Sequence, residues 1–118
     1  MLTGIHSVLI WSEDVKRLAP FYRDVLGLEQ QMEGEGFAVF LSNGAQLAIG
    51  RHSEVKGRSR DPNRVMVNFR VEDCQAEYER LNKQGVEFIR KPSKEGDGPT
   101  IATLLDPDGN VLQLFQER

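Results

Sequence analysis

Cysteine is almost absent from the sequence, which contains only Cys74 among 118 residues. One cysteine cannot form an internal disulfide and has no second cysteine at a zinc-ligand spacing. The sequence therefore excludes a disulfide scaffold and a cysteine-rich zinc site. We interpret Cys74 as a small residue of a helix, in agreement with a reducing compartment.

Long apolar runs are also missing. No stretch approaches the roughly eighteen consecutive apolar residues of a membrane span. The N-terminal residues Met1–His6 lack the basic segment and apolar core of a secretory signal. We therefore expect a soluble cytoplasmic protein, and the net charge of −3 argues against nucleic acid or an anionic membrane as its main partner.

The first half of the chain predicts a strand, a helix and three further strands. Ser12 is the expected helix N-cap, Pro20 is expected to kink or break the helix, and Gly27 is its expected end. The strands are predicted from alternating or continuous apolar residues and from the hairpin turn Ser42–Gly44, over Ile5–Trp11, Glu29–Met32, Phe37–Leu41 and Gln46–Ile49.

The second half repeats this order. Asp73 is expected to cap a helix that ends at Gly85, and Lys91–Pro99 is expected to be a long polar loop. The strands are predicted over Val65–Val71, Val86–Ile89, Thr100–Leu105 and Val111–Phe115, with the turn Asp106–Gly109 before the last one.

Short sequence matches support an internal repeat, since Glu13-Asp14 corresponds to Glu72-Asp73 and Gln46-Leu47 to Gln113-Leu114. Because Arg51–Arg64 is basic and shows no periodicity, we interpret it as an exposed connector. Its cations could also steer an anionic ligand; they are Arg51, His52, Arg58, Arg60 and Arg64. At this length, the chain is expected to form one domain of two β-α-β-β-β modules, about residues 1–58 and 63–118.

Two segments, Phe21–Leu28 and Asp106–Leu114, together with His6, resemble the vicinal-oxygen-chelate superfamily. This superfamily includes glyoxalase I, bleomycin- and fosfomycin-resistance proteins, extradiol dioxygenases and methylmalonyl-CoA epimerase. The resemblance implies an α+β fold in which two β-α-β-β-β modules form a cupped mixed sheet. It also implies a homodimer, with the cup formed either within one chain or across two.

The resemblance further implies four metal-ligand positions, which are occupied here by His6, Gln46, Met66 and Gln113. The usual residues at these positions are His or Gln, Glu, His and Glu. An imidazole, two neutral amides and a thioether contain no carboxylate, although Zn, Ni, Mn and Fe sites favour carboxylate and imidazole ligands. We therefore expect no metal cofactor; a divalent ion, if present, would be held by His6, Gln46 and Gln113.

Alternation along the strands places the remaining candidates. Gln46 is expected on the cavity face of its strand, and Gln113 shares a face with Phe115. A register slip of two residues would exchange Met66 for Asn68. The expected ligand-binding residues are therefore His6, Gln46, Met66, Asn68, Gln113 and Phe115.

Other residues carry less specific signals. His6 is the best acid-base candidate, and it could equally be a hydrogen-bonded strand histidine. Alternation assigns Trp11 to the helix side, and Tyr22 is expected to be a core aromatic. The loop Lys91–Pro99 is either an exposed loop or a lid.

These observations favour a protein that binds a small, partly aromatic or oxygen-rich molecule without metal, as in the drug-resistance branch. The alternative is a divergent metal-dependent lyase, isomerase or dioxygenase. A metal-free enzyme with His6 as its base is a third hypothesis, for which no second acid-base group is found on the expected cavity face.

Overall fold

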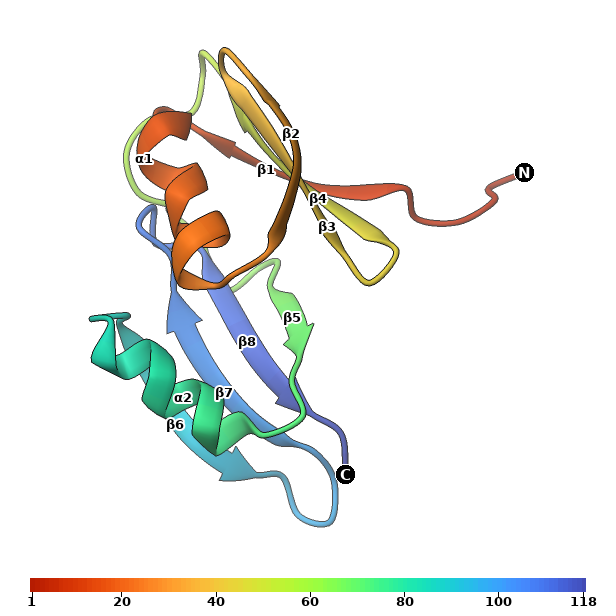
Figure 1. Cartoon of the computed structure of the whole chain (residues 1–118), viewed down its shortest axis with the longest axis vertical. Helices are drawn as coiled ribbons and strands as arrows, with labels where there is room; N and C mark the ends of the chain where they lie inside the picture. Colours follow the sequence, from red (N-terminus) through yellow and green to blue (C-terminus); the bar gives the residue numbers. More distant parts are fainter. The chain divides into compact units, whose positions relative to one another are not determined.

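The computed structural model describes residues 1–118 as two compact units, Met1–Gly57 and Arg58–Arg118. Each unit has the element order β-α-β-β-β, with a four-stranded mixed sheet and one helical segment (Figure 1). The predicted α+β fold of two such modules is therefore confirmed. Neither helical segment is long and apolar enough to cross a membrane.

The first unit contains a sheet in the order β1-β4-β3-β2, in which β1 runs parallel to β4 and the other neighbours are antiparallel. Its strands are β1 (Ser7–Ser12), β2 (Glu29–Gly34), β3 (Phe37–Ser42) and β4 (Ala45–Arg51). Positive φ angles at Asn43 and Gly44 form the predicted hairpin turn between β3 and β4.

The helical segment of this unit consists of α1 (Val15–Pro20) and a π-helical turn, Phe21–Val25. The predicted interruption at Pro20 is confirmed: the helix changes type there, and the Leu26 N–H donates to the Phe21 carbonyl five residues back. Because proline lacks an N–H, it cannot donate the hydrogen bond that a continuous α-helix requires.

Ser12 was expected to cap this helix, and that prediction is wrong. The Asp14 carboxylate accepts from the Arg17 N–H at 3.3 Å, so Asp14 is the N-cap. Ser12 still belongs to β1, where it pairs with Arg51. Its buried hydroxyl instead accepts from the Asp14 N–H at 3.0 Å and thereby supports the residue that caps the helix.

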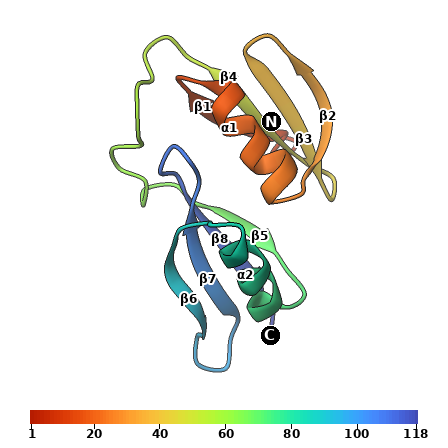
Figure 2. The same cartoon turned by 60° about the vertical axis from the view of Figure 1, so that its left-hand side comes forward.

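The second unit has the sheet order β5-β8-β7-β6, with β5 parallel to β8 (Figure 2). Its elements are β5 (Val67–Arg70), α2 (Cys74–Lys83), β6 (Phe88–Lys94), β7 (Thr100–Leu105) and β8 (Val111–Gln116). Asp73 caps α2 by accepting from the Ala76 N–H at 3.1 Å, as predicted. Gly85, with φ of 84°, follows the end of this helix.

The prediction of a long loop over Lys91–Pro99 is wrong in its first half, because β6 continues to Lys94. Arg90 pairs with Thr103 and Ser93 with Ile101, with register shifts on either side of Arg90. This edge strand carries polar side chains and irregular pairing, so it lacks the apolar alternation by which strands are recognised. Only residues 95–99 connect β6 to β7.

Each helix covers one face of its own sheet and buries a separate core there. The fully or almost fully buried side chains of the first unit include Leu18, Tyr22, Phe40, Leu47 and Ile49. Those of the second unit include Cys74, Leu81, Leu104, Leu112 and Leu114. The opposite face of each sheet has no helix, and the residues expected to bind a ligand lie mainly on these opposite faces.

The turn before β8 is held by one buried carboxylate. Asp106 Oδ1 accepts from the backbone N–H groups of Asp108 and Asn110, each at 2.9 Å, and Oδ2 accepts from Asn110 Nδ2 at 2.8 Å. Gly109, with φ of 79°, takes the left-handed conformation that the turn requires. This turn sets where β8 begins and therefore which of its side chains lie on each face.

We predict that Asp106→Ala lowers the free energy of unfolding by about 2–4 kcal/mol, because three hydrogen bonds to a buried carboxylate are lost. Urea unfolding followed by far-UV circular dichroism measures the change. Asp97→Ala is the matched control, since Asp97 is exposed in the β6–β7 loop. An equal effect of the two substitutions would contradict the role assigned to Asp106.

Candidate functional site

The helix-free face of the first sheet, which we call face A, is made of three rows of side chains that run across the strands. The ladder pairings place in these rows Ser7, Gln46, Leu41 and Glu29; then Leu9, Ala48, Val39 and Met32; then Trp11, Gly50, Phe37 and Gly34. One row is mostly polar, one is aliphatic and one combines aromatic residues with glycine.

The assignment of Trp11 to the helix side is wrong. Trp11 pairs with Gly50, the neighbour of the fully buried Ile49, whereas Ile49 itself pairs with Ile10. Side chains alternate along a strand, so Ile10 lies under the helix and Trp11 lies on face A. Because the residues of β1 are apolar in both phases, their pattern alone did not distinguish the two faces.

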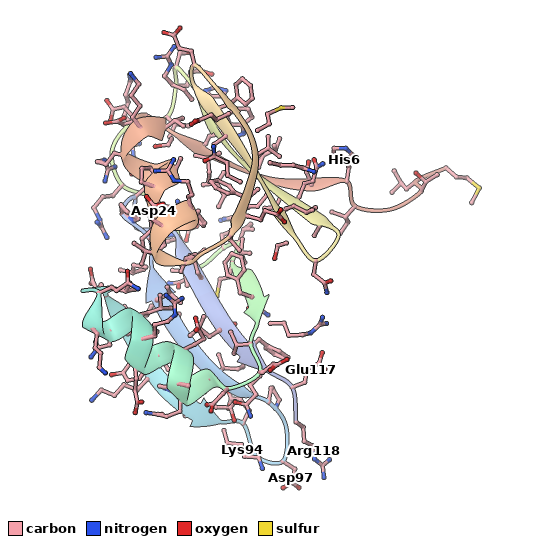
Figure 3. The ribbon with its side chains drawn as sticks, in the orientation of Figure 1. His6, Asp24, Lys94, Asp97, Glu117 and Arg118 are labelled. Carbon is pink, nitrogen blue, oxygen red and sulfur yellow. The ribbon has the colours of Figure 1, made fainter.

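His6 lies just before β1 and is exposed, as Figure 3 shows. The ladder pairs Ser7, not His6, with Gln46, and His6 Nδ1 lies 3.2 Å from the Ser7 hydroxyl. Ser7 was not among the predicted site residues. The internal repeat did not single it out, because the seven-residue spacing to the helix cap matches Ser7 with Met66, which has no ladder partner.

The helix-free face of the second sheet, which we call face B, has two rows. They contain Asn68, Gln113, Thr103 and Arg90, and then Arg70, Phe115, Ile101 and Ser93. The structure therefore brings Asn68, Gln113 and Phe115 together. Met66 precedes β5 and has no ladder partner, so the two-residue alternative, Asn68, is the residue that pairs with Gln113.

On face B, the amide side chain of Gln113 has one weak hydrogen bond, and the two arginines form exposed ion pairs. Gln113 Nε2 donates to Thr103 Oγ1 at 3.4 Å, near the upper limit for a hydrogen bond. Arg70 lies 3.3 Å from Glu117, and Arg90 lies 2.9 Å from Glu95. Exposed ion pairs of this kind contribute little stability, so their arginines could exchange partners at low cost.

These donors do not fit the metal that the resemblance implies. Face A offers a hydroxyl and an amide at its paired positions, Ser7 and Gln46, and face B offers the amides of Asn68 and Gln113. No group of three or more His, Cys, Asp or Glu residues lies close enough to hold an ion. Neutral oxygen ligands without carboxylate or imidazole are poorly suited to Zn, Ni, Mn or Fe.

Of the remaining candidates, Tyr22 is fully buried and contacts Phe21 and Phe40 at ring-centroid distances of 5.4 and 6.4 Å, as expected for a core aromatic.

The β6–β7 loop lies at the end of the second unit, where Figure 3 labels Lys94 and Asp97 close to the C-terminal residues. The lid role of this loop stays a prediction.

The basic connector is partly held by side-chain contacts. His52 packs edge-on against Trp11 with a centroid distance of 5.5 Å and an interplanar angle of 71°. The Arg58 guanidinium lies against Gly109 of the turn before β8, and Arg64 pairs with Asp61 at 3.0 Å. These contacts give several of its cations structural roles.

Cys74 is the first residue of α2 and is fully buried, with its sulfur 3.9 Å from the Leu114 carbonyl. Burial raises the pKa of the Cys74 thiol, and the charge of Asp73 raises it further. A buried thiol with a raised pKa is a poor nucleophile. This placement agrees with the structural interpretation of Cys74.

We predict that native protein at pH 8 reacts slowly with a disulfide reagent such as Ellman's reagent and that guanidinium-unfolded protein reacts promptly. The raised pKa keeps the thiol protonated, and burial blocks access. Absorbance of the released thiolate follows the reaction. Equal rates in the two states would show that Cys74 is accessible in the native protein.

Comparison with known proteins gives consistent matches along the chain. The family model of the Glyoxalase/Bleomycin resistance protein/Dioxygenase superfamily matches residues 4–114. The Bacillus subtilis protein YraH is 27% identical over 115 residues, covering 87% of this chain and 90% of that protein. The metallothiol transferase FosB of Staphylococcus saprophyticus is 22% identical, covering 97% of this chain and 77% of that protein.

Solved structures show the same fold. A member of the glyoxalase/bleomycin resistance protein/dioxygenase superfamily from Sphaerobacter thermophilus matches with a TM-score of 0.80 and 23% identity, covering 98% of each chain. At this identity the likeness shows the fold and leaves the reaction open.

Proposed function

Because the chain belongs to the glyoxalase/bleomycin resistance protein/dioxygenase superfamily, we propose that it binds a small, partly aromatic or oxygen-rich molecule without a metal ion. The observation that carries this proposal is the presence of paired neutral hydrogen-bonding side chains on helix-free sheet faces. Gln46 lies beside Ser7 on face A, and Gln113 lies beside Asn68 on face B.

Apolar and polar side chains would contribute differently to binding. Gln46 has Ala48 and Leu41 as neighbours on face A, and Gln113 is followed on face B by Phe115. Contact with such apolar groups supplies affinity, at about 25 cal/mol for each Å² removed from water. Each amide adds both a donor and an acceptor, which orient a ligand that carries oxygen.

We predict that Gln46→Ala or Gln113→Ala weakens the binding of the ligand that occupies the corresponding face by roughly 2- to 12-fold, the loss of a neutral hydrogen bond worth about 0.5–1.5 kcal/mol. A thermal-shift screen of aromatic and oxygen-rich compounds supplies candidates, and titration calorimetry gives their dissociation constants.

Gln84→Ala is the control for these substitutions, since Gln84 is exposed at the end of α2. Binding that responds to none of the three changes would place the ligand elsewhere. A screen in which no compound shifts the melting temperature of the wild-type chain would contradict the proposed function itself.

We predict that the purified protein contains far less than one equivalent of Zn, Ni, Mn or Fe per chain, because its paired positions lack carboxylate and imidazole ligands. Plasma mass spectrometry measures the content, with His6→Ala as the comparison. Near-stoichiometric metal that disappears in His6→Ala would instead support a divergent metal-dependent lyase, isomerase or dioxygenase.

The homodimer and the cytoplasmic location remain part of this proposal. Family membership supports the first, and the composition of the sequence supports the second. The role of His6 as an acid-base residue is also a prediction. The 3.2 Å contact between His6 Nδ1 and the Ser7 hydroxyl supports it, because that contact keeps the imidazole at the start of β1, near the polar row of face A.

A further inference from the structure

Two aromatic rings on face A lie directly over glycine residues of the neighbouring strands. A Cβ atom added to Gly50 would come within 2.6 Å of Trp11 Cζ3 and 2.9 Å of Cε3. A Cβ atom added to Gly34 would meet the Phe37 ring in the same way, at Cε1 and Cζ. Each ring therefore occupies the space that a side chain on the paired strand would take.

Gly50 lies within β4 and Gly34 is the last residue of β2; glycine in the middle of a strand weakens the sheet by about 0.5–1 kcal/mol relative to alanine. A glycine in a strand often marks the close approach of another group, and an aromatic ring across the strand can cover it. Here Gly50 and Gly34 let the indole and the phenyl ring lie low on the sheet. His52 supports the indole further through its edge-on contact.

The outer sides of the rings remain available. Trp11 is 45% exposed and Phe37 is 41% exposed, and the exposed aliphatic side chains Leu9 and Met32 lie in the adjacent row. We call these four residues the aromatic platform. Large apolar side chains gathered on one exposed face commonly mark a binding surface.

The charge of face A limits what the platform can bind. Glu29 is the only charged residue among the side chains that form the face, and no Lys or Arg is among them. The faces of aromatic rings carry negative partial charge and attract cations. An anion would meet no Lys or Arg side chain in these rows, and a neutral or positively charged ring would meet none that repels it.

We infer that face A binds a planar heteroaromatic ring, neutral or positively charged, that stacks on Trp11 and Phe37. Ser7 and Gln46 then form hydrogen bonds with its polar edge. This inference rests on the proposed function and specifies the class of molecule that one of the two faces takes.

The test uses proflavine, a planar aromatic cation, titrated with the full chain and followed by fluorescence polarisation. Trp11→Leu and Phe37→Leu each remove a ring but keep an apolar side chain, and each is expected to weaken binding about tenfold, within the range known for the loss of one stacking partner. Trp11→Phe, which keeps a ring, is expected to retain most of the affinity.

Ile89→Leu is the matched control, since it changes an exposed apolar residue of β6 in the second unit at nearly constant volume and is expected to alter affinity by less than about twofold. Naphthalene-2-sulfonate, which is planar and anionic, and tetraethylammonium, which is cationic and not planar, are expected to compete poorly with proflavine. In the wild type, binding is also expected to quench Trp11, the only tryptophan.

Circular dichroism melts establish that each variant is folded. Three results would overturn the inference: no proflavine binding by the wild type, unchanged binding by both leucine variants, or ready displacement of proflavine by naphthalene-2-sulfonate. A change from dimer to monomer in Trp11→Leu, detected by light scattering, would also overturn it, since the platform would then be an interface between copies. If another compound binds in a Gln46-dependent or Gln113-dependent manner, the proposed function stands without this inference.

Discussion

Parallel pairing between the first and last strands of each module is the constraint on which the candidate site depends. Side chains alternate along both strands, so one correct pair determines the whole face. The pair Ser7 and Gln46 places Trp11 beside Gly50, and the pair Asn68 and Gln113 places Arg70 beside Phe115. A slip of one residue would turn Gln46 toward the helix and expose the core residue Leu47.

Local interactions at the strand ends keep this register. The Ser12 hydroxyl supports Asp14, which caps α1 immediately after β1. The Asp106 carboxylate holds the turn from which β8 starts. Short polar side chains therefore set where each element begins, and burial of Leu, Ile and Phe side chains stabilises the arrangement.

The two modules share one topology and differ in surface chemistry. Face A has mostly apolar and aromatic side chains and a single carboxylate, whereas face B has two amides, two hydroxyls and two arginines within its rows. Of the four positions to which the resemblance assigns metal ligands, His6 keeps an imidazole, whereas Gln46, Met66 and Gln113 have neutral side chains. The fold can be retained through such changes because its core lies on the opposite, helix-covered faces.

The order of elements along the chain, most helix ends and the turns followed from the sequence because they depend on near neighbours along the chain. Examples are Asp73 as a cap, Pro20 as an interruption, and Gly27, Gly85 and Gly44 at helix ends and in the hairpin turn. The match between Gln46 and Gln113 also followed from the sequence, through the internal repeat.

Three features did not follow from the sequence: the face on which Trp11 lies, the pairing of Ser7 with Gln46, and the continuation of β6 through polar residues. Each depends on register with a strand distant in the sequence, and β1 and β6 lack the clear apolar-polar alternation that would reveal it. The contacts of Trp11 with Gly50 and of Phe37 with Gly34 likewise exist only once the strands are paired, so tertiary structure alone decided the shape of the aromatic platform.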